Sequence, residues 1–552
     1  MSDMEERPVS ARESEKNEPP FASDGASMSS SAVSVPVAVV ERGGGDLEKT
    51  TSKSTQRTHR SHRSQWEQQI TSAADWTGDD DPDNPLNWPL AKKIYHVLIP
   101  AFQCFTITFG SSVISPSTPE IAAHFNVSRT AAIVPLTVYV LGLGLGPVMS
   151  APLSETYGRR AVYLLFFPPS LLFTLGAGFS NSFASLVICR LLAGILGSGC
   201  LAVGAGTNSD LFVHFDRAVA SAMFLVAPFL GPSLGPAIGG YVAMKRSWRW
   251  TQWVILFAGA VSYAVCVPQK ETYKRIILER RAKKLGVPGP PNPLPPGMSK
   301  WRFIFLVTIS RPLHMLVTES IVAFLSVYVA FNFSVLFGFF AAFPLVFQHA
   351  VPEIRIYDFN QGESGLVFLG IGAGVVLAAA IFIVMDRLTY RKKTLKRRAT
   401  GDFTPLPPEE RLWAAMLGSV LLPISLFWFG WSARKDVHWI SPVLATIPFG
   451  VGNMLVFCSG VLYLIDTYGP LTGASAVAAN GVLRYVIGAV FPLFTVQMYQ
   501  ALGVHWSTSL FGFVTIAMMP IPWVLYKFGP SIRRRSSYTH TPQERTRTEG
   551  PK

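Results

Sequence analysis

The sequence carries little charge for its length. Asp, Glu, Lys and Arg make up 15% of the 552 residues, whereas soluble domains carry about 25%. Hydrophobic residues reach 49%, and the mean hydropathy is +0.31. This deficit excludes an ordinary set of soluble domains and predicts an integral membrane protein. The 45 glycines and 13 tryptophans fit closely packed helices with aromatic side chains at the membrane interface.

Residues that carry chemistry are also scarce. No cysteine pair has metal-ligand spacing or implies a disulfide framework, and we interpret the cysteines as small buried hydrophobic residues. No phosphate-binding GxxxxGK[ST] string occurs, which argues against a nucleotide-driven pump. Within the apolar runs, His, Asp and Glu are single and scattered, so we expect neither an enzyme nor a metal or other cofactor. The five cysteines are Cys104, Cys189, Cys200, Cys266 and Cys458.

Long apolar runs dominate the chain after residue 92. A membrane-spanning helix needs about 20 mainly apolar residues, and several runs contain no charge at all. The sequence therefore predicts an all-α membrane protein with 12 transmembrane helices in two six-helix halves. We place the spans at about 95–116, 131–153, 161–180, 184–209, 217–243, 250–268, 315–347, 364–385, 412–433, 439–465, 472–500 and 505–526.

The charges in the loops predict the orientation. Loops on one side carry 21 Lys and Arg residues, against seven on the other side, and cytoplasmic loops are the more positive ones. Both termini are then cytosolic, and the net charge of +14 reflects orientation rather than binding to nucleic acid. The Asn126 sequon falls in the first external loop, where it is a candidate glycosylation site.

Composition also divides the chain into segments. The first 92 residues cannot bury enough apolar surface to order themselves, and they contain no cleavable signal. We expect a multi-pass protein of the plasma membrane, with the vacuolar membrane as the alternative. The predicted segments are a disordered cytosolic tail at 1–92, a first six-helix half at 93–268, a cytosolic linker at 269–310, a second half at 311–528 and a cytosolic tail at 529–552.

A charged turn joins the second and third predicted spans. It holds Glu155, Gly158, Arg159 and Arg160. Glycine permits a turn with positive φ, and the carboxylate can pair with an arginine or face a helix N-terminus. The turn is either a conformational latch that breaks and reforms, or an ordinary positive loop.

Two arginines fall inside predicted spans, where a charge must face the interior and find partners. Arg190, in the fourth span, either lowers the pKa of a nearby carboxyl group and releases its proton, as a proton-coupling residue, or is satisfied by backbone carbonyls. Arg484, in the eleventh span, lies four residues after Asn480, so both share one helix face. The pair either binds anionic or carbonyl groups or joins helices structurally. Tyr139 and Tyr328 are candidate lining residues of an apolar cavity.

The fifth predicted span contains a dense glycine and proline string, GPSLGPAIGG. Gly231 and Gly235 form a small-xxx-small face, and Pro236 favours a kink. With Gly239 and Gly240, the string predicts a bent, closely packed helix that seals a cavity on one side.

One acidic residue falls inside the long seventh run. Glu319 lies near its predicted cytosolic end and is a candidate protonation site. Alternatively, it is a helix-end carboxylate that snorkels or pairs with Arg311.

Together these elements resemble the major facilitator superfamily. The charged turn resembles its motif A, the segment of Arg190 its motif B, and the fifth-span string its motif C, the antiporter signature. Further strings resemble fungal 12-spanner drug:proton antiporters, over about 80–530. They include DPDNPLNW at 81–88, EERL at 409–412 and FPLF at 491–494.

The resemblance implies a proton-coupled efflux transporter of drugs, toxins or a self-made metabolite. It would work by alternating access between the two halves, with a small molecule, protons and the lipid bilayer as its partners, and as a monomer. An importer or facilitator of a nutrient, organic acid or polyamine on the same fold is the alternative, because a fold does not fix direction.

Overall fold

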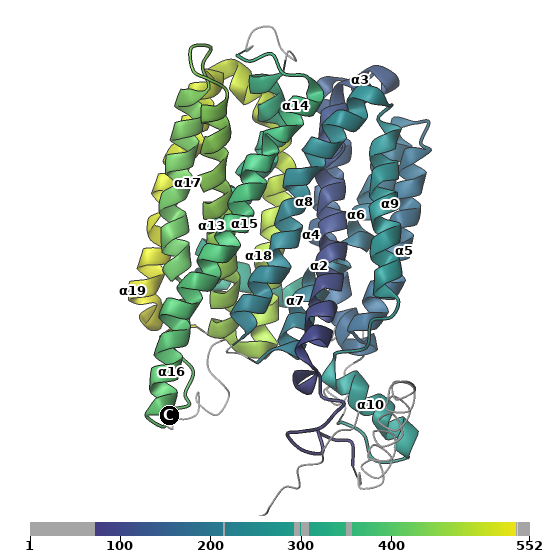
Figure 1. Ribbon diagram of the computed structural model, residues 1–552, viewed down its shortest axis with the longest axis vertical. Helices are drawn as coiled ribbons and strands as arrows, with labels where there is room; N and C mark the ends of the chain where they lie inside the picture. Colours follow the sequence, from purple (N-terminus) through teal and green to yellow (C-terminus); the bar gives the residue numbers. More distant parts are fainter. Residues whose placement is uncertain are drawn as a thin grey trace, which may run out of the picture. The chain divides into compact units, whose positions relative to one another are not determined.

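The computed structural model describes residues 72–213, 216–291, 299, 309–348, 356–536 and 538. Most of the predicted tails and most of the proline-rich linker lie outside these residues. The described residues form helices packed side by side in a bundle (Figure 1). Their only β pairing is an isolated bridge between Gln348 and Phe359. The all-α part of the prediction is confirmed.

The first helix set, α2 to α9, covers the segment predicted as the first half. Apolar runs become helices here because a lipid-exposed backbone must satisfy its own hydrogen bonds. Serine side chains cap two of the starts: Ser128 Oγ accepts from the Ala131 amide at α4, and Ser182 Oγ from the Ser185 amide at α6. The helices are α2 (Leu90–Ser112), α3 (Thr118–Phe125), α4 (Arg129–Tyr157), α5 (Arg159–Gly178), α6 (Phe183–Gly197), α7 (Gly199–Leu211), α8 (Arg217–Lys245) and α9 (Arg249–Cys266).

The second helix set, α13 to α19, covers the segment predicted as the second half. A separate helix, α10 (Lys274–Leu285), and the short α12 (Arg311–Thr318) lie between the two sets in sequence. The helices of the second set are α13 (Ser320–Phe347), α14 (Gln361–Leu366), α15 (Phe368–Asp386), α16 (Lys392–Ala399), α17 (Trp413–Ser432), α18 (Ile440–Met518) and α19 (Pro520–Arg534).

Ten helical stretches of the described residues are long and apolar enough to cross a membrane. The prediction of 12 differs for two reasons. Helix α9 is long enough but is not among the ten, because the polar residues at its start, Arg249 to Gln252, lower its mean hydropathy; it nevertheless packs against α2 and α5. The stretch from Thr472 to Arg534 is 63 residues long and includes Gly503, whose φ of 73° breaks the helix. The stretches are Leu90–Phe125, Arg129–Tyr157, Arg159–Gly178, Phe183–Leu211, Arg217–Lys245, Ser320–Phe347, Gln361–Ala399, Trp413–Ser432, Ile440–Gly469 and Thr472–Arg534.

Two predicted boundaries are wrong. The seventh span begins at Ser320 rather than 315, because Glu319 has extended backbone (φ −99°, ψ 106°) and separates α12 from α13. The last helix, α19, continues to Arg534, into the segment predicted as a tail from 529. At Glu319 the apolar composition continues across a change in backbone direction, whereas the end of α19 is basic and remains helical.

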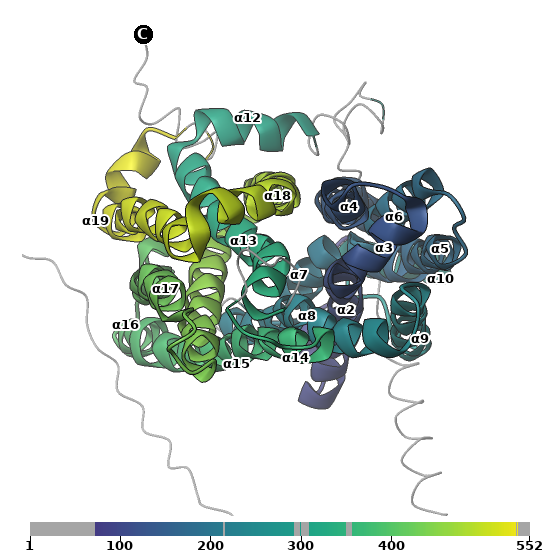
Figure 2. The ribbon, with the colours of Figure 1, turned by 90° about the horizontal axis from the view of Figure 1, so that it is seen from above.

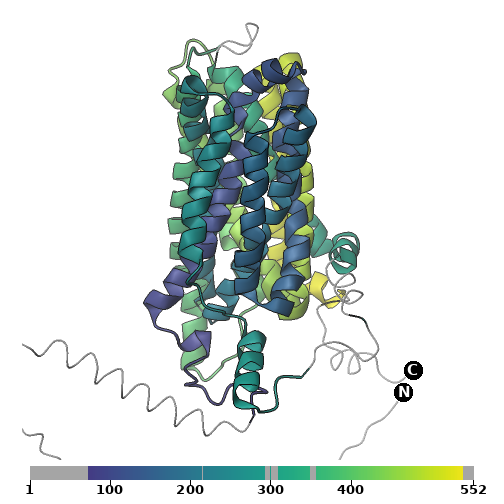
Figure 3. The same cartoon turned by 90° about the vertical axis from the view of Figure 1, so that its right-hand side faces the viewer.

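The bundle has two distinguishable ends (Figure 1). Helices α3 and α14 lie at one end, and α10 and α16 at the other; we call these the α3 end and the α10 end. Seen along the bundle, the first and second helix sets lie on opposite sides, with α8 next to α14 and α15 (Figure 2). The turned view places the teal helix α10 below the bundle (Figure 3). Asn126 is exposed at the α3 end, in a left-handed conformation at the C-terminus of α3.

Residues 72–89, which precede α2, form a segment that we call the N-terminal strap. The Arg281 guanidinium on α10 donates to both carboxylate oxygens of Asp81 at 2.8 Å, and to Asp83 at 3.0 Å. Trp76 lies over the same guanidinium, 5.6 Å from ring centroid to Cζ. Burial opposes ionisation of Asp81, but the hydrogen bonds from Arg281 outweigh it and hold the pKa of that carboxyl below its usual range. The prediction of a disordered segment up to residue 92 is therefore wrong from residue 72 onward.

Candidate functional site

Arg190 is completely buried in the middle of α6, within the first helix set. Its guanidinium donates to the Gly110 carbonyl at 2.8 Å, to Gln252 Oε1 at 3.4 Å and to the Pro135 carbonyl at 3.5 Å. It lies 4.1 Å from the ring centroid of Tyr139. None of these partners is a carboxylate, so backbone and amide dipoles from α2, α4 and α9 stabilise the charge.

Tyr139 supports Arg190 rather than standing free in a cavity. The ring is buried, and its hydroxyl donates to the Ile107 carbonyl at 3.0 Å. The helices come this close because both α4 and α6 have glycine at their crossing. A Cβ on Gly142 would lie 2.7 Å from the Leu191 carbonyl oxygen, and one on Gly194 would lie 2.5 Å from the Tyr139 carbonyl oxygen. The glycines next to Arg190 therefore position its partners.

Glu319 lies at the α10 end, in the break between α12 and α13. Its side chain is buried, with 5% of the residue surface exposed, and it accepts a hydrogen bond from the Tyr468 hydroxyl at 3.0 Å. Glu319 belongs to the second helix set, and Arg190 to the first. None of the hydrogen-bond partners of Arg190 belongs to the second helix set.

Arg484 occupies the middle of the second helix set, on α18. Three aromatic rings surround its guanidinium, with centroids 4.4 Å away for Tyr485 and 4.6 Å away for Phe333 and Phe457. Its Nε has no hydrogen-bond partner among the described residues. One turn earlier, Asn480 donates to Ser326 Oγ at 3.5 Å, so both members of the predicted pair face α13. Arg484 is therefore held by ring faces, whereas Arg190 is held by oxygen acceptors.

Tyr328 is fully buried on α13. Its hydroxyl has no hydrogen-bond partner among the described residues, and neither does the side chain of Asn332 one turn later. Two unsatisfied polar side chains on one helix face are costly, and they supply donors and acceptors for a molecule bound there.

The charged turn at the α10 end is organised by a carboxylate that is distant in sequence. Glu271 accepts hydrogen bonds from the amides of Arg159 at 2.9 Å and Arg160 at 3.2 Å, the first residues of α5. Gly158 has φ of +100°, as the turn predicts, and a Cβ there would collide with the Glu271 carboxylate. Glu271, rather than Glu155, therefore neutralises the N-terminus of α5.

Arg159 makes the ion pair of this turn. Its Nε lies 3.2 Å from Asp210 Oδ2 on α7, and its Nη1 donates to Ser154 Oγ. Glu155 is exposed and forms no hydrogen bond or ion pair within the described residues. The Arg160 guanidinium donates to the Val267 carbonyl at 3.2 Å. All of these contacts stay inside the first helix set, so the predicted latch in this conformation joins neighbouring helices rather than the two sets.

An equivalent cluster lies at the same end of the second helix set. Arg411 pairs with Asp386 and with Asp466, both at 2.9 Å, and its guanidinium lies 3.5 Å from the ring centroid of Tyr390. The segment that begins at Asp386 resembles motif A but lacks its glycine. A π-helical turn, Arg387–Arg391, follows Asp386. Asp216 and Arg391 approach to 3.9 Å across the two sets, as a half-exposed pair. Such exposed pairs contribute little stability.

The glycine string on α8 packs against α2 as predicted for a sealing helix. A Cβ on Gly231 would lie 2.6 Å from the Phe109 amide nitrogen, and one on Gly235 would lie 2.9 Å from the Val113 amide nitrogen. A Cβ on Gly239 would meet the Val113 carbonyl group. These glycines, four residues apart, form a continuous contact surface toward the α3 end.

The same helix meets the second set at the α3 end. A Cβ on Gly240 would collide with the Gln361 carbonyl oxygen, and one on Gly365 would collide with that of Pro236. The Gly362 amide donates to Met244 Sδ at 3.2 Å. A second contact between the sets lies between α4 and α18, where the side chains of Thr130 and Gln497 are hydrogen-bonded at 2.9 Å. These close contacts join the two sets at this end.

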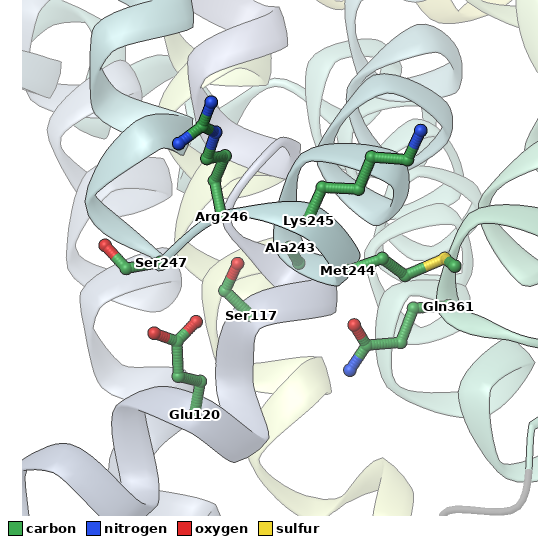
Figure 4. Close-up of a pocket in the computed structure, with 8 residues that line it drawn as sticks. All are labelled: Ser117, Glu120, Ala243, Met244, Lys245, Arg246, Ser247 and Gln361. Carbon is green, nitrogen blue, oxygen red and sulfur yellow. The ribbon is translucent and has the colours of Figure 1, made fainter.

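A shallow pocket of about 460 Å³ lies outside this contact (Figure 4). Its lining comes from α3, the end of α8 and the start of α14. It presents Glu120 opposite the cationic residues Lys245 and Arg246. The pocket is open, so it forms a vestibule above the α8 seam rather than an enclosed binding site.

Sequence reasoning missed several of these partners. Glu271 lies more than 100 residues from the turn that it caps, and the backbone carbonyls around Arg190 give no side-chain signal. A sequence signal was present for Arg411, which lies in the EERL string at 409–412.

Comparisons with known proteins agree with this geometry. The Major Facilitator Superfamily model matches residues 101–492. The chain is 42% identical over 500 residues to "Polyamine transporter 4" of Saccharomyces cerevisiae, covering 86% of this chain and 75% of the relative. It is 38% identical over 467 residues to "Efflux pump FUB11" of Gibberella moniliformis (83% and 76%). It is also 38% identical over 467 residues to the multidrug transporter mdrA of Aspergillus fumigatus (83% and 75%).

The fold also resembles a solved structure. The proton:xylose symporter XylE, bound to 6-bromo-6-deoxy-D-glucose, superposes with a TM-score of 0.56 at 14% identity, over 80% of this chain and 96% of that chain. At this identity the likeness concerns the fold alone. Together with the family match and the 42% identical relative, it identifies a multi-pass membrane transporter rather than an enzyme, and this chain belongs to the major facilitator superfamily.

Proposed function

We propose that the protein is a proton-coupled exporter of small organic molecules across the plasma membrane. It works as a monomer by alternating access between two six-helix halves, at 93–268 and 311–528. Drugs, toxins or a metabolite made by the cell are the substrate classes. Relatives named as efflux pumps and a multidrug transporter support export.

The proposal includes 12 crossings with both termini in the cytosol. Counting α9 as a crossing, and dividing the stretch after Thr472 at Gly503, adds two to the ten candidate spans. The α10 end then faces the cytosol, because the basic linker and the α16 segment lie there. The α3 end faces outward, which makes the exposed Asn126 available for glycosylation.

The observation that carries the proposal is the tight contact of α8 with α2 and α14 at the α3 end. Glycine backbones touching across this seam allow a small rigid-body rotation to open or close it. At the opposite end, the contacts between the sets include the weak pair of Asp216 and Arg391 and the electrostatic interaction of Arg217 with Asp466. We read this as a conformation closed toward the outside, one of the two that alternating access requires.

Proton coupling is assigned to Glu319 and Arg190. Glu319 is buried beside Tyr468, where protonation removes a charge and changes the energy of one conformation relative to the other. Arg190 supplies a fixed buried cation in the first half. Each entering proton provides about 2.3 kcal/mol per 100 mV of membrane potential, and about 1.4 kcal/mol per pH unit of gradient.

The motif A turn acts as the cytosolic latch of this cycle. Arg159, Arg160 and Gly158 hold α5 in place through Glu271. Glu155, exposed beside Arg159, is then available to a partner in the opposite conformation. The substrate cavity candidates are Tyr328, Asn480 and Arg484. Tyr139 instead packs against the Arg190 guanidinium and helps to hold it in place.

The test is expression in an efflux-deficient yeast, with accumulation measured for a panel of compounds. We expect uphill extrusion that collapses when a protonophore is added. Arg190→Ala should abolish extrusion while the protein still reaches the cell surface. Arg434→Gln, at an exposed arginine, is the matched control and should extrude normally.

Two results contradict the coupling. Full extrusion by Arg190→Ala would remove Arg190 from it. Glu319→Gln keeps a hydrogen-bond acceptor for Tyr468 but cannot ionise, so an unchanged pH dependence of extrusion would remove Glu319.

The alternative is an importer or facilitator on the same fold. The 42% identical relative is named a polyamine transporter, which keeps polyamines among the candidate cargoes. Net uptake of a labelled compound that persists when the protonophore is present would favour the facilitator over the exporter.

A further inference from the structure

The aromatic set around Arg484 spans both halves of the protein. Phe333 and Phe457 belong to the second half, and Phe229 of α8 belongs to the first. Phe229 lies 5.1 Å from Phe457 and 6.1 Å from Phe333, between ring centroids. On the other side, a Cβ on Gly144 of α4 would lie 2.8 Å from Tyr485 Cβ. Arg484 therefore lies where the two halves meet, in the position at which transporters of this architecture hold their substrates.

The described carboxylates of the membrane spans lie elsewhere. Asp210 is in the last turn of α7, Asp386 is the last residue of α15, and Glu319 precedes α13. Asp466 pairs with Arg411 in that same region, at the α10 end. At the level of Arg484, the described charges are thus cationic and not acidic.

The two arginines inside the spans differ in how far their guanidinium groups are already hydrogen-bonded. Arg190 donates to three oxygen acceptors. Arg484 has no carboxylate partner within the described residues, and its Nε has no hydrogen-bond partner there. Its neighbours are the faces of Phe333 and Phe457 and the Tyr485 side chain, which also interacts with it electrostatically. Stacked rings fix the plane of a guanidinium and leave its N–H edge available, and this edge matches a planar carboxylate. A buried cation without a counter-ion is costly, so an anionic ligand gains more there than a neutral one.

We infer that Arg484 is the substrate-anion site, and that this exporter takes organic monocarboxylates with an aromatic or similarly flat apolar body. The inference rests on the proposed function and names its substrate class. The carboxylate receives the Arg484 guanidinium, whose Nε has no partner among the described residues, and the apolar body packs among Phe229, Phe333 and Phe457. A protonated amine meets a cation at this position and is disfavoured, which sets this chain apart from a carrier of polyamines.

Equilibrium binding to the purified full-length protein tests the inference without relying on direction or proton coupling. The probes are 2-naphthoate, its neutral analogue 2-naphthamide, the cationic analogue 2-naphthylmethylamine, and spermidine. We expect naphthoate to bind about ten- to hundredfold more tightly than the amide, as charge-assisted hydrogen bonds would give. Neither amine should displace it.

Variants assign the preference to the residue. Arg484→Gln should reduce the affinity for naphthoate about ten- to hundredfold and bring it level with that for the amide. The matched control is Arg434→Gln, which removes an arginine that also lies over a ring, 5.5 Å from Trp431, but on the surface. It should leave all affinities unchanged. Phe457→Leu keeps the charge and should weaken both naphthalene ligands together.

Several outcomes overturn the inference. These are failure of naphthoate to bind, an amide or amine that binds as tightly as the acid, and an Arg484→Gln protein that keeps the preference for the acid. If Arg484→Gln does not fold, the order of the four probes on the unsubstituted protein decides. Protonophore-sensitive extrusion of spermidine alone would overturn the inference while the proposed export stands. Selective binding of naphthoate without uphill extrusion would support the inference and overturn the proposed export.

Discussion

The contact between α2 and α8 should fail when a single methyl group is added to it. In Gly231→Ala the new Cβ would lie 2.6 Å from the Phe109 amide nitrogen. Ordinary van der Waals contact begins at 3.4 Å, so the two helices must separate by about 0.8 Å. The Thr108 hydroxyl, which lies nearest, can rotate away, but the backbone atoms of Thr108 and Phe109 cannot. Overpacking of this kind costs about 1–3 kcal/mol.

This overpacking destabilises the conformation in which the seam is closed. A penalty of about 1–3 kcal/mol changes an equilibrium between two conformations about 5- to 150-fold. Ser117, beyond the end of α2, is only 1% exposed and lines the pocket above the seam. In a Ser117→Cys protein, we expect Gly231→Ala to raise the rate of alkylation by an impermeant maleimide applied to intact cells, by a factor in this range.

The matched control is Gly460→Ala on α18, where the new Cβ would lie 3.8 Å from the nearest atom, an ordinary contact. It should leave the alkylation rate and transport unchanged. If Gly231→Ala is alkylated at the parental rate and transports normally, the glycine seam does not close the outer side, and the reasoning from motif C is wrong.

Three further changes have definite expected outcomes. Glu271→Gln should lower the free energy of unfolding by about 1–3 kcal/mol, because four backbone amides lose a charged acceptor; an unchanged melting temperature would contradict the cap. Arg411→Gln leaves the carboxylates of Asp386 and Asp466 buried without the Arg411 cation, and should lower the free energy of unfolding by about 3–5 kcal/mol. The same thermal assay measures this loss, with Arg434→Gln as the control. The bond between Asp81 of the strap and Arg281 of α10 should be insensitive to pH between 5 and 8. The folded pKa of that carboxyl is lowered, so its contribution is present above the unfolded value of about 3.9 and is lost only as pH falls through the folded value. Loss of hydrogen-exchange protection in residues 72–89 already at pH 6 would contradict it.

Much of the bundle was predictable because lipid imposes a simple rule. A span must be apolar and helical, so the run from 439 to 465 predicts the first part of α18 within a few residues. The same rule fails at Glu319, because α12 is also apolar on one side and the run continues through the break. At α9 the predicted span, 250–268, matches the helix within two residues, although its opening residues, Arg249 to Gln252, are polar or interfacial.

The candidate site was predictable only in its parts. The sequence identifies Arg190 and Arg484 as costly charges, and both are interior. It does not distinguish them, since the difference lies in what surrounds each: carbonyls from two other helices for Arg190, and rings from two other helical segments for Arg484. Contacts of this kind depend on helix crossing points, which a single sequence does not encode locally.

The clamp between the strap and α10 also limits how the two halves are tethered. Because Arg281 fixes α10 to the residues just before α2, this part of the linker moves with the first half. Twenty-five residues, from Gly286 to Ser310, connect α10 to the start of α12, and a chain of that length can span up to about 80–90 Å. If the two halves rock as proposed, the length of this connection does not restrict them, whereas a change at the clamp alters which half holds α10.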